Sequence, residues 1–407
     1  MNPQFDWLDN GGATSAKGFL ACGVAAGIKV GRDDMALLFS EKTDTAAAAL
    51  FTSNKVAAAP VLLGRERVAG GKCRGVVANA GCANACTGEP GYQDAVQMAR
   101  LAADALGIPE SQMLCSSTGT IGRRLGMEKI AAGIKLAKDA LSPDGGAAAA
   151  RAIMTTDTVP KEAALSYTDA GGARITIGGM CKGAGMICPN LATMLCYITT
   201  DAAVAPGALK AALQAAASKS FNRITIDGDQ STNDTMLLLA NGAAGGSLIT
   251  ADSAGYPLFV QALVELAAKL AKKIVEDGEG ATKFVTVAVE NAATAADALL
   301  AARAIANSPL FKTACFGADP NWGRVICAAG YSGAEVDDMK TRISFDDVTV
   351  YDRGKIADAS TNDRLAQVMA QHAFVVRVDL GLGAFSDEVY TCDFSYDYVK
   401  INGEYTT

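Results

Sequence analysis

Three segments of the chain carry apolar residues at the spacing of an amphipathic helix. A helix is predicted at 206–219, because Pro206 suits a first helical turn, and an alanine-rich helix is predicted at 95–106. In the third segment, 257–274, the apolar positions lie on one helical face: Leu263, Leu266, Leu270 and Ile274. Because each helix also has a polar side, we expect these helices to pack on a sheet.

Other segments show the patterns of β-strands. KFVTVAVE (283–290) alternates and is rich in β-branched residues, and GVVANAG (75–81) is a short apolar run. The last stretch, EVYTCDFSYDYVKIN (388–402), alternates in the same way, so we expect an ordered strand there. This mixture of strands and helices predicts an α/β or α+β protein. The polar loop at 278–282 is the clearest candidate boundary, followed by a last unit of helix and strand.

The composition is that of a globular protein with a large core. The chain has 407 residues, half of them hydrophobic, which favours two or more packed units. Its start lacks the features of a signal peptide, and no uncharged apolar stretch approaches about 18 residues, so we expect a cytoplasmic protein without a membrane span. The net charge is -7 and Lys and Arg are scattered, which argues against a nucleic-acid partner.

The cysteines and the single histidine restrict the chemistry. Eleven cysteines in a reducing compartment are expected to be mostly small buried hydrophobes and not disulfides. Cys82 and Cys86 form a CxxxC without a second close pair, so no metal site is predicted. His372 lies where a helix gives way to a strand, and we expect a structural or surface role for it. A catalytic base is then better supplied by another group, such as an N-terminal α-amine with a pKa of about 7.7–8.0.

The most informative window for chemistry is residues 178–202, GGMCKGAGMICPNLATMLCYITTDA. Glycines and the Pro189-Asn190 turn precede MLCYIT, which has the pattern of a buried strand. A threonine at such a junction could attack a strained peptide bond, although an ordinary strand threonine is the simpler interpretation from these residues alone. A phosphate-binding loop is excluded, because Lys182 lacks the following Ser or Thr and the upstream glycine spacing.

KGAGM followed by PNLATML and ITTDA resembles the processing site of the ornithine acetyltransferase family. Further blocks match the family in the same order along nearly the whole chain: 17–29, 83–88, 116–122, 155–161, 220–235, 277–283 and 317–325. Two small departures are Leu191, where methionine is expected, and Cys82, in a segment that usually reads Gly-Asn.

The resemblance implies an N-terminal-nucleophile-like α/β sandwich, of the type shared with D-aminopeptidase, with a smaller C-terminal α/β unit. It also implies self-cleavage between Ala192 and Thr193, giving an alpha chain of residues 1–192 and a beta chain of residues 193–407 in an α2β2 heterotetramer. Within the beta chain, residues 193–280 would complete the main sandwich, and about 281–407 would form the smaller unit.

The reaction implied by the resemblance is transfer of the acetyl group of N2-acetyl-ornithine to glutamate in arginine biosynthesis. Thr193 would attack the preceding carbonyl, water would open the resulting ester, and the freed α-amine would serve the Thr193 hydroxyl as base. The transfer then runs by a ping-pong scheme through an acetyl-threonine. No cofactor or metal is implied, and the sequence leaves open whether acetyl-CoA is a second donor.

Individual site residues follow from the same resemblance. Thr118 and Gly119 match the residues that hold the oxyanion, where positioned donors contribute about 2.7–4 kcal/mol each. Substrate-binding positions are matched by Thr156, Lys182, Thr193, Glu279, Asn402 and Thr407. The alternatives that the residues alone leave open are a turn at SSTGT, a structural ion pair for Lys182 and an ordinary solvated loop glutamate for Glu279. The polar segments 227–235 and 317–324 are interpreted as structural.

Two other functions remain open at this point. One is an aminopeptidase or amidase on the same fold, which gives the acyl group to water. The other is a non-catalytic ligand-binding or scaffold protein, which has no reason to split at residue 192, so a denaturing gel distinguishes it.

Overall fold

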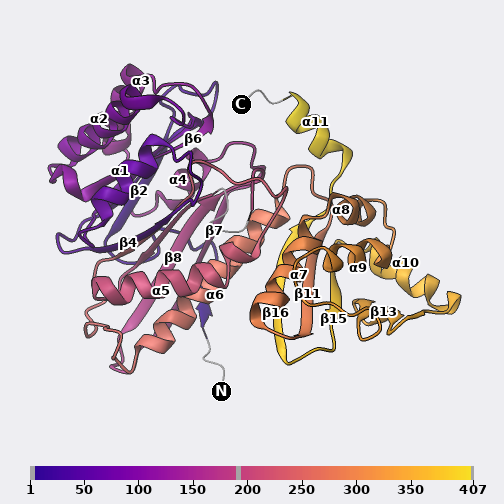
Figure 1. Cartoon of the computed structure of the whole chain (residues 1–407). Coiled ribbons are helices and arrows are strands. Elements are labelled where there is room, and N and C mark those ends of the chain that lie inside the picture. The colour runs from indigo at the N-terminus through magenta and orange to yellow at the C-terminus, as the bar shows by residue number, and fades with distance from the viewer. Residues whose placement is uncertain (1–4, 189–193, 405–407) are drawn as a thin grey trace. The chain divides into compact units, whose positions relative to one another are not determined.

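The computed structural model describes residues 5–188 and 194–404, which fold into two compact units (Figure 1). The first unit comprises the residues up to Asn222 together with Gln230–Ile274. The second comprises Arg223–Asp229 and the residues from Val275 on. Each unit has its own sheet system and its own core.

The first unit contains two stacked sheets. The six-stranded sheet has the order β1 (Asp6–Trp7), β7 (Lys161–Thr168), β8 (Arg174–Lys182), β9 (Leu195–Thr200), β10 (Thr235–Ala240), β4 (Ala46–Phe51). The four-stranded sheet has the order β2 (Phe19–Val24), β3 (Met35–Ser40), β5 (Gly75–Cys82), β6 (Met113–Thr120). Neighbouring strands are antiparallel except for two parallel pairs, β9 with β10 and β5 with β6.

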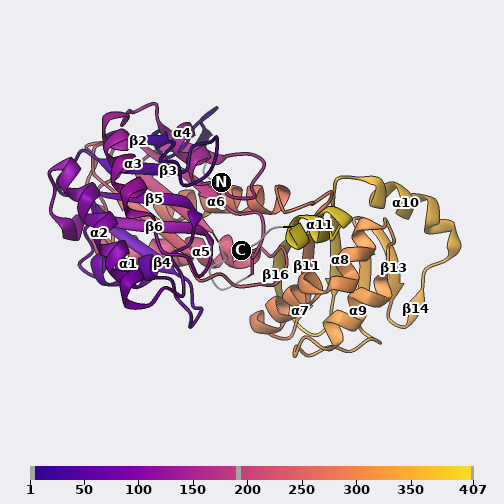
Figure 2. The same ribbon diagram turned by 90° about the horizontal axis from the view of Figure 1, so that it is seen from above.

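Helices cover the outer faces of both sheets, as Figures 1 and 2 show for α1–α3 on one side and α5–α6 on the other. The helices of this unit are α1 (Ala59–Val68), α2 (Gly88–Leu106), α3 (Met127–Asp139), α4 (Gly146–Ala152), α5 (Pro206–Ser218) and α6 (Tyr256–Glu276). The contact of α6 with β8 is close, because a Cβ on Gly179 would lie 2.9 Å from the Leu270 side chain. The layers therefore follow the order helix, sheet, sheet, helix.

The core between the two sheets is made by their inward-facing residues together with Ala149, Ala150 and Ala152 of α4. Phe19, Leu38 and Leu114 of the four-stranded sheet belong to one cluster with Tyr197 and Leu237 of the six-stranded sheet. Every residue of β9 is buried, as expected for a strand with a layer on each face. The end of β9 that follows residue 193 is thus held in the interior of the first unit.

The second unit has one six-stranded sheet covered by short helices. Its order is β14 (Lys355–Ile356), β13 (Val348–Asp352), β12 (Arg342–Phe345), β15 (Ala373–Asp379), β11 (Phe284–Ala292), β16 (Phe385–Cys392). Its helices are α7 (Ala295–Asn307), α8 (Pro309–Phe316), α9 (Trp322–Gly330), α10 (Asn362–Ala370) and α11 (Tyr396–Glu404). The prediction of an α/β sandwich with a smaller C-terminal α/β unit is confirmed.

Most predicted elements are present, with one error at the C-terminal end. Helices α5 and α6 and strands β5 and β11 match their predictions, while the helix predicted at 95–106 begins earlier, at Gly88. The strand predicted at 388–402 is wrong beyond Cys392, because Tyr396–Glu404 form α11. The Ser395 hydroxyl accepts the N–H of Tyr398 at 3.3 Å and thereby pairs a backbone donor of the first helical turn. This local bond favours a helix over the strand that the alternating pattern predicts.

The cysteines and the histidine lie as predicted. All eleven cysteines lie in the described residues and none forms a disulfide, and all are buried except Cys86, Cys188 and Cys327. His372 lies between α10 and β15, is exposed, and has its Nδ1 2.9 Å from the carbonyl oxygen of Thr282. In the part of the chain that the structure describes, no helix is long and apolar enough to cross a membrane.

Glu162 in β7 makes the stability of the protein depend on pH. It is partly buried, and burial raises its pKa from 4.5 to about 7 despite the opposing charges of Arg151 and Lys273. Between these two pH values the folded state binds more protons than the unfolded state, so the free energy of unfolding falls as the pH rises.

We expect Glu162→Gln to remove this dependence. Relative to the variant, the wild type should lose about 1–3 kcal/mol of unfolding free energy between pH 4.5 and pH 8. Urea unfolding of both proteins at the two pH values measures the difference. Identical changes with pH in the two proteins would show that Glu162 is ionised in the folded state.

Candidate active site

Thr118 and Gly119 lie at the end of β6, where this strand meets β5. Thr118 is 8% exposed, and the pairing with β5 shifts register between Gly81 and Cys82. Gly119 has a φ of +127°, and a Cβ there would lie 2.4 Å from the carbonyl carbon of Gly81. Only glycine allows this close approach of the two backbones, so the SSTGT segment is a strand end with an irregular register and not the turn that its composition suggests.

Lys182 is the last residue of β8 and points to Thr118. The residue is 4% exposed, and its ammonium donates to the Thr118 hydroxyl at 3.5 Å. Lys182 also pairs in register with Leu195, the first residue of β9. A buried cation therefore stands beside the Thr118 hydroxyl, opposite the strand that follows residue 193.

Asp157 supplies the negative charge next to Lys182. Its Oδ2 lies 4.0 Å from the Lys182 ammonium, and its Oδ1 accepts from the Lys161 ammonium at 2.7 Å and from the Gly183 N–H at 2.7 Å. Burial acts to raise the pKa of Asp157, but the charges of Lys182 and Lys161 outweigh it and hold this pKa well below the ordinary value. Asp157 thus remains a carboxylate that holds both Lys182 and the turn at Gly183.

Within residues 155–161 the sequence assigned a role only to Thr156, and the structure adds Asp157. Thr156 is partly buried and directly precedes the carboxylate. The signal that could have identified Asp157 is the pair of lysines at 161 and 182, because a buried ammonium requires an acidic partner.

The segment 227–235, interpreted as structural from its sequence, reaches the same place. Asn233 donates from Nδ2 to the carbonyl oxygens of Ser117 at 2.8 Å and Ala83 at 2.7 Å, which ties β10 to the end of β6. Asp234 accepts the N–H of Met194 at 3.2 Å through Oδ1. Both residues are therefore positioned around the start of β9.

Lys29 is a second lysine that the sequence left without a role. Burial is the largest cause and, together with the charges of Arg32 and Lys182, lowers the pKa of Lys29 to about 8, against the opposing charges of Asp34 and Asp157. Its Nζ donates to the carbonyl oxygen of Met154 at 2.7 Å. The electrostatic coupling places Lys29 in the same charged cluster as Lys182 and Asp157.

Three predicted site residues, Ala192, Thr193 and Thr407, lie outside the described residues. The described chain reaches Cys188 on one side of the predicted cleavage position and resumes at Met194 on the other. The assignment of Thr193 as nucleophile and of Thr407 as a substrate-binding residue therefore stays a prediction.

Glu279 and Asn402 are brought together within the second unit. Asn402 lies on α11 and donates from Nδ2 to Glu279 Oε2 at 2.7 Å. Gly280 beside them has a φ of +66°, and a Cβ there would lie 2.5 Å from the Tyr398 nitrogen, so glycine is required where α11 packs on this loop. Glu279 is 8% exposed and is not the solvated loop glutamate that its sequence context suggests.

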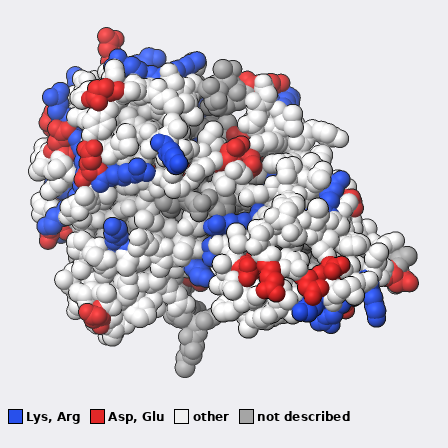
Figure 3. All heavy atoms as spheres, in the orientation of Figure 1, with Lys and Arg blue, Asp and Glu red and all other residues white. Residues whose placement is uncertain are grey.

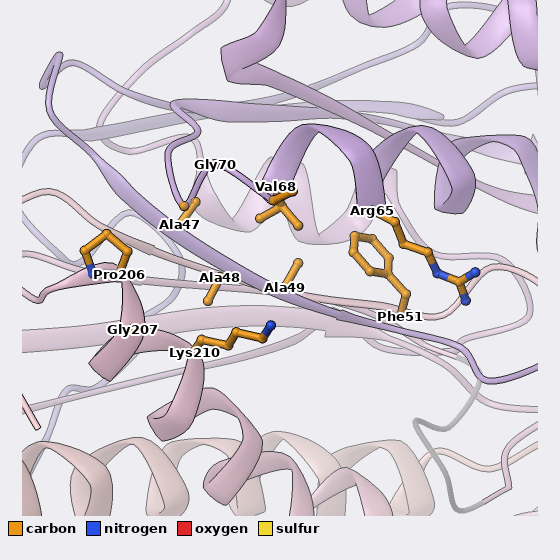
Figure 4. Close-up of a pocket in the computed structure, with 12 residues that line it drawn as sticks. Ala47, Ala48, Ala49, Phe51, Arg65, Val68, Gly70, Pro206, Gly207 and Lys210 are labelled. Atoms are coloured by element: carbon orange, nitrogen blue, oxygen red, sulfur yellow. The ribbon is translucent and has the colours of Figure 1, made fainter.

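A separate groove of about 440 Å³ runs along the free edge of β4, between α1 and α5 (Figure 4). Arg65 and Lys210 are the charged residues that line it, together with Phe51, Pro206 and a row of alanines. None of the catalytic or substrate-binding residues predicted from the sequence lines this groove.

The arrangement in the first unit suits an acyl transfer between amino acids. The four cations Lys182, Lys161, Lys29 and Arg32 outnumber the two acids Asp157 and Asp34, so the cluster favours a carboxylate ligand and a developing oxyanion. In the described residues, no group of three or more His, Cys, Asp or Glu could hold a metal ion. On the face seen in Figure 3, charges of both signs are interspersed.

Comparisons with known proteins agree with this chemistry. The model of the ArgJ family matches residues 20–407. The chain is 51% identical over 405 residues to the arginine biosynthesis bifunctional protein ArgJ of Symbiobacterium thermophilum, covering 99% of this chain and 100% of the relative. It is 44% identical to the glutamate N-acetyltransferase of Methanocaldococcus jannaschii, covering 98% and 99% of the two chains.

A solved structure of this kind is also similar. The crystal structure of arginine biosynthesis bifunctional protein ArgJ from Bacillus halodurans matches with 39% identity and a TM-score of 0.50, over 51% of this chain and 98% of that chain. The solved chain is therefore about half as long as the one described here.

Proposed function

The chain belongs to the ArgJ family, and on this premise we propose that it transfers the acetyl group of N2-acetyl-ornithine to glutamate through an acetyl-threonine at Thr193. The enzyme is a glutamate N-acetyltransferase of arginine biosynthesis. In the proposal the precursor cuts itself between Ala192 and Thr193, and the two fragments stay together in an α2β2 assembly in the cytoplasm.

The proposed chemistry has two acyl transfers. The Thr193 hydroxyl attacks the acetyl carbonyl of the donor, and the Thr193 α-amine takes the hydroxyl proton. The C–N bond then breaks, and the α-amine passes this proton to ornithine, which leaves. The amine of glutamate then attacks the acetyl ester, and the proton that this amine loses passes through the α-amine to the Thr193 hydroxyl. Thr118 and Gly119 stabilise the oxyanion in both steps, and Lys182 holds the α-carboxylate of each substrate in turn.

The single observation that carries this proposal is the convergence of described residues at the start of β9. Lys182 pairs with Leu195 and donates to Thr118, while Asp234 holds Met194, the residue after Thr193. The half-length chain of the Bacillus halodurans relative also supports cleavage, because a precursor cut after residue 192 yields chains of this size.

In the proposal Glu279 binds the ammonium of ornithine, and Thr156, Asn402 and Thr407 complete substrate binding. Glu279 is buried and already accepts a hydrogen bond from Asn402, which supports a carboxylate fixed in one orientation. No cofactor is proposed. Acetyl-CoA is proposed as a second donor, supported by the relatives that are named bifunctional.

An acetyl-transfer assay tests the proposed function. Purified protein is given labelled N2-acetyl-ornithine or acetyl-CoA as donor, with and without glutamate. We expect labelled N-acetyl-glutamate from N2-acetyl-ornithine and from acetyl-CoA, and no product from acetyl-CoA would contradict its role as a second donor. Release of free acetate at a rate that glutamate does not reduce would favour the amidase alternative.

His372 should have little effect on turnover. The ring is exposed, and its Nδ1 makes a hydrogen bond with the backbone carbonyl of Thr282. These contacts give no support to a role as catalytic base. We expect His372→Asn to keep kcat within a few-fold of the wild type. A loss above about a thousandfold in a folded variant, roughly 4 kcal/mol of activation free energy, would make histidine the base.

A further inference from the structure

Lys29 lies in the loop between β2 and β3, and this loop is fixed from the interior of the first unit. Asp34 is buried, and its carboxylate accepts the backbone N–H groups of Ala26 and Lys29, both at 2.7 Å. The Asp34 carbonyl oxygen accepts the Ala80 N–H at 2.8 Å, which ties the loop to β5. The backbone of Lys29 is therefore anchored beside the last residues of β5.

The side chain of Lys29 extends to the predicted oxyanion residues. Its stem packs on Gly81, which has a φ of +105° and where a Cβ would lie 2.9 Å from the Lys29 Cγ, so glycine is required at this position. The carbonyl carbon of Gly81 is also the atom that a Cβ on Gly119 would approach most closely. The Lys29 stem and Gly119 thus lie against the same backbone segment.

The Lys29 ammonium reaches the chain segment just before Asp157. It donates to the Met154 carbonyl oxygen at 2.7 Å. The next N–H of this segment, that of Thr155, donates to Asp157 Oδ2 at 3.0 Å, and the same oxygen lies 4.0 Å from the Lys182 ammonium. One peptide group and two hydrogen bonds therefore connect Lys29 to the carboxylate that holds Lys182.

Lys29 differs from the other lysines of this cluster because it has no acidic partner. Asp157 lies 2.7 Å from the Lys161 ammonium and 4.0 Å from the Lys182 ammonium. Among the described residues, no carboxylate lies within 4.0 Å of the Lys29 ammonium, and its hydrogen-bond acceptor is a neutral carbonyl. Burial is the largest cause of its lowered pKa of about 8, so the charge of Lys29 is poorly solvated. A bound anion would stabilise this charge.

The two substrates of the proposed reaction differ in their carboxylates. N2-acetyl-ornithine has one carboxylate and a side-chain ammonium, whereas glutamate has a second carboxylate at the end of its side chain. In the proposed function Lys182 holds the α-carboxylate of either substrate. The second carboxylate of glutamate then requires another cation, because an anion that is taken out of water without a partner is strongly disfavoured.

We propose that Lys29 binds the side-chain carboxylate of the acceptor glutamate and thereby selects this acceptor. The ammonium has three N–H donors, so it keeps its hydrogen bond to the Met154 carbonyl and donates another to the carboxylate. The donor has no second carboxylate and does not need Lys29. This inference rests on the proposed function, because it concerns the acceptor of the second acyl transfer.

Isotope exchange separates the two half-reactions and tests the proposal. In a ping-pong scheme, label exchanges between ornithine and N2-acetyl-ornithine without glutamate, and between glutamate and N-acetyl-glutamate without ornithine. Both exchanges are measured at subsaturating substrate in the wild type and in Lys29→Met, which keeps an apolar stem for Gly81 but has no charge. Thermal unfolding of each protein reports folding.

Lys129→Met is the matched control. Lys129 lies on α3, is exposed, and donates to the Gly27 carbonyl of the same loop at 2.6 Å. Its replacement removes a lysine and a backbone contact from this loop without changing the charge beside Lys182. We expect both exchanges to stay within a few-fold of the wild type.

In Lys29→Met we expect the glutamate exchange to fall about 10–100-fold, the loss that corresponds to one charge-assisted hydrogen bond. The ornithine exchange should stay within a few-fold, because ornithine lacks a second carboxylate. Lys29→Arg retains the charge and should recover part of the glutamate exchange. This selective loss would not follow from a structural role, which affects both exchanges.

Equal losses of both exchanges in folded Lys29→Met would reduce Lys29 to a structural residue that supports the segment before Asp157. An unchanged glutamate exchange would mean that a different cation binds the second carboxylate. If Lys29→Met does not fold, Lys29→Gln, which keeps a donor for the Met154 carbonyl, must show the same selective loss, and equal losses there contradict the inference.

Failure of the proposed function gives a different result. An active wild type without either exchange would contradict the acetyl-threonine. The role of Lys29 would then be decided by the complete reaction, in which Lys29→Met must raise the KM for glutamate and not that for N2-acetyl-ornithine. A folded wild type that transfers no acetyl group to glutamate would remove the proposed function and the inference together.

Discussion

Replacing Thr193 with alanine will leave a single chain of 407 residues without acetyltransferase activity. The hydroxyl is required both to attack the Ala192 carbonyl and to carry the acetyl group, so its removal abolishes both steps. Removing the nucleophile of a comparable acyl-transfer enzyme costs about 10⁶-fold in kcat, and we expect a loss of at least about 10⁴-fold here. A denaturing gel and N-terminal sequencing follow the first step, and the transfer assay follows the second.

Thr193→Ser is the matched control, because it retains a hydroxyl at the same position. We expect it to be cleaved and to keep measurable activity, with a second N-terminus that reads Ser-Met-Leu-Cys in place of Thr-Met-Leu-Cys. An intact wild-type chain that transfers acetyl groups at the full rate would contradict the mechanism.

The second large effect is expected for Lys182→Ala. If donor and acceptor use one site in turn, wild-type initial rates with both substrates varied will give parallel double-reciprocal lines, and labelled donor alone will leave one acetyl group on the fragment that starts at Thr193. Removing Lys182 deprives each substrate carboxylate of a charge-assisted bond, which contributes about 1.5–3 kcal/mol. We therefore expect a weakening of about 10–100-fold in both half-reactions.

Lys312→Met serves as the control for the loss of a buried lysine. Lys312 is 0% exposed, lies in the second unit and donates to the Thr391 hydroxyl at 2.7 Å, so its removal should lower stability without affecting one half-reaction more than the other. Intersecting lines without a trapped acetyl-threonine would mean direct transfer in a ternary complex. Impairment of only one half-reaction by Lys182→Ala would mean that the two substrates bind in different ways.

Local patterns predicted most of the elements, because burial on one face of a helix or strand is repeated at a short spacing in the sequence. The apolar face of 257–274 and the alternation of 283–290 correspond to α6 and β11. The same reasoning failed at residues 396–404, where the Ser395 cap and the contact of Gly280 with Tyr398 favour a helix. Counting alternating residues cannot detect a single capping hydrogen bond.

The residues of the candidate site were predicted unevenly. The motif resemblance identified Thr118, Gly119 and Lys182, and the structure brings Lys182 to the Thr118 hydroxyl. The motif resemblance assigned no role to Asp157, Lys29 or Asp234, whose significance depends on burial. An aspartate in a polar run reads as a solvated turn residue until the fold removes water from it and places a lysine or a backbone N–H beside it.

By itself, the sequence determined the family and the α/β class, and it predicted the cleavage position and a mechanism without a histidine base, because these depend on residue identity and on spacing along the chain. Only the tertiary structure decided which polar side chains share one buried site. The ends of β6 and β8 and the start of β9 meet through pairing and sheet stacking between segments far apart in sequence. The charge balance around Lys182 arises from that meeting, since it depends on the exclusion of water.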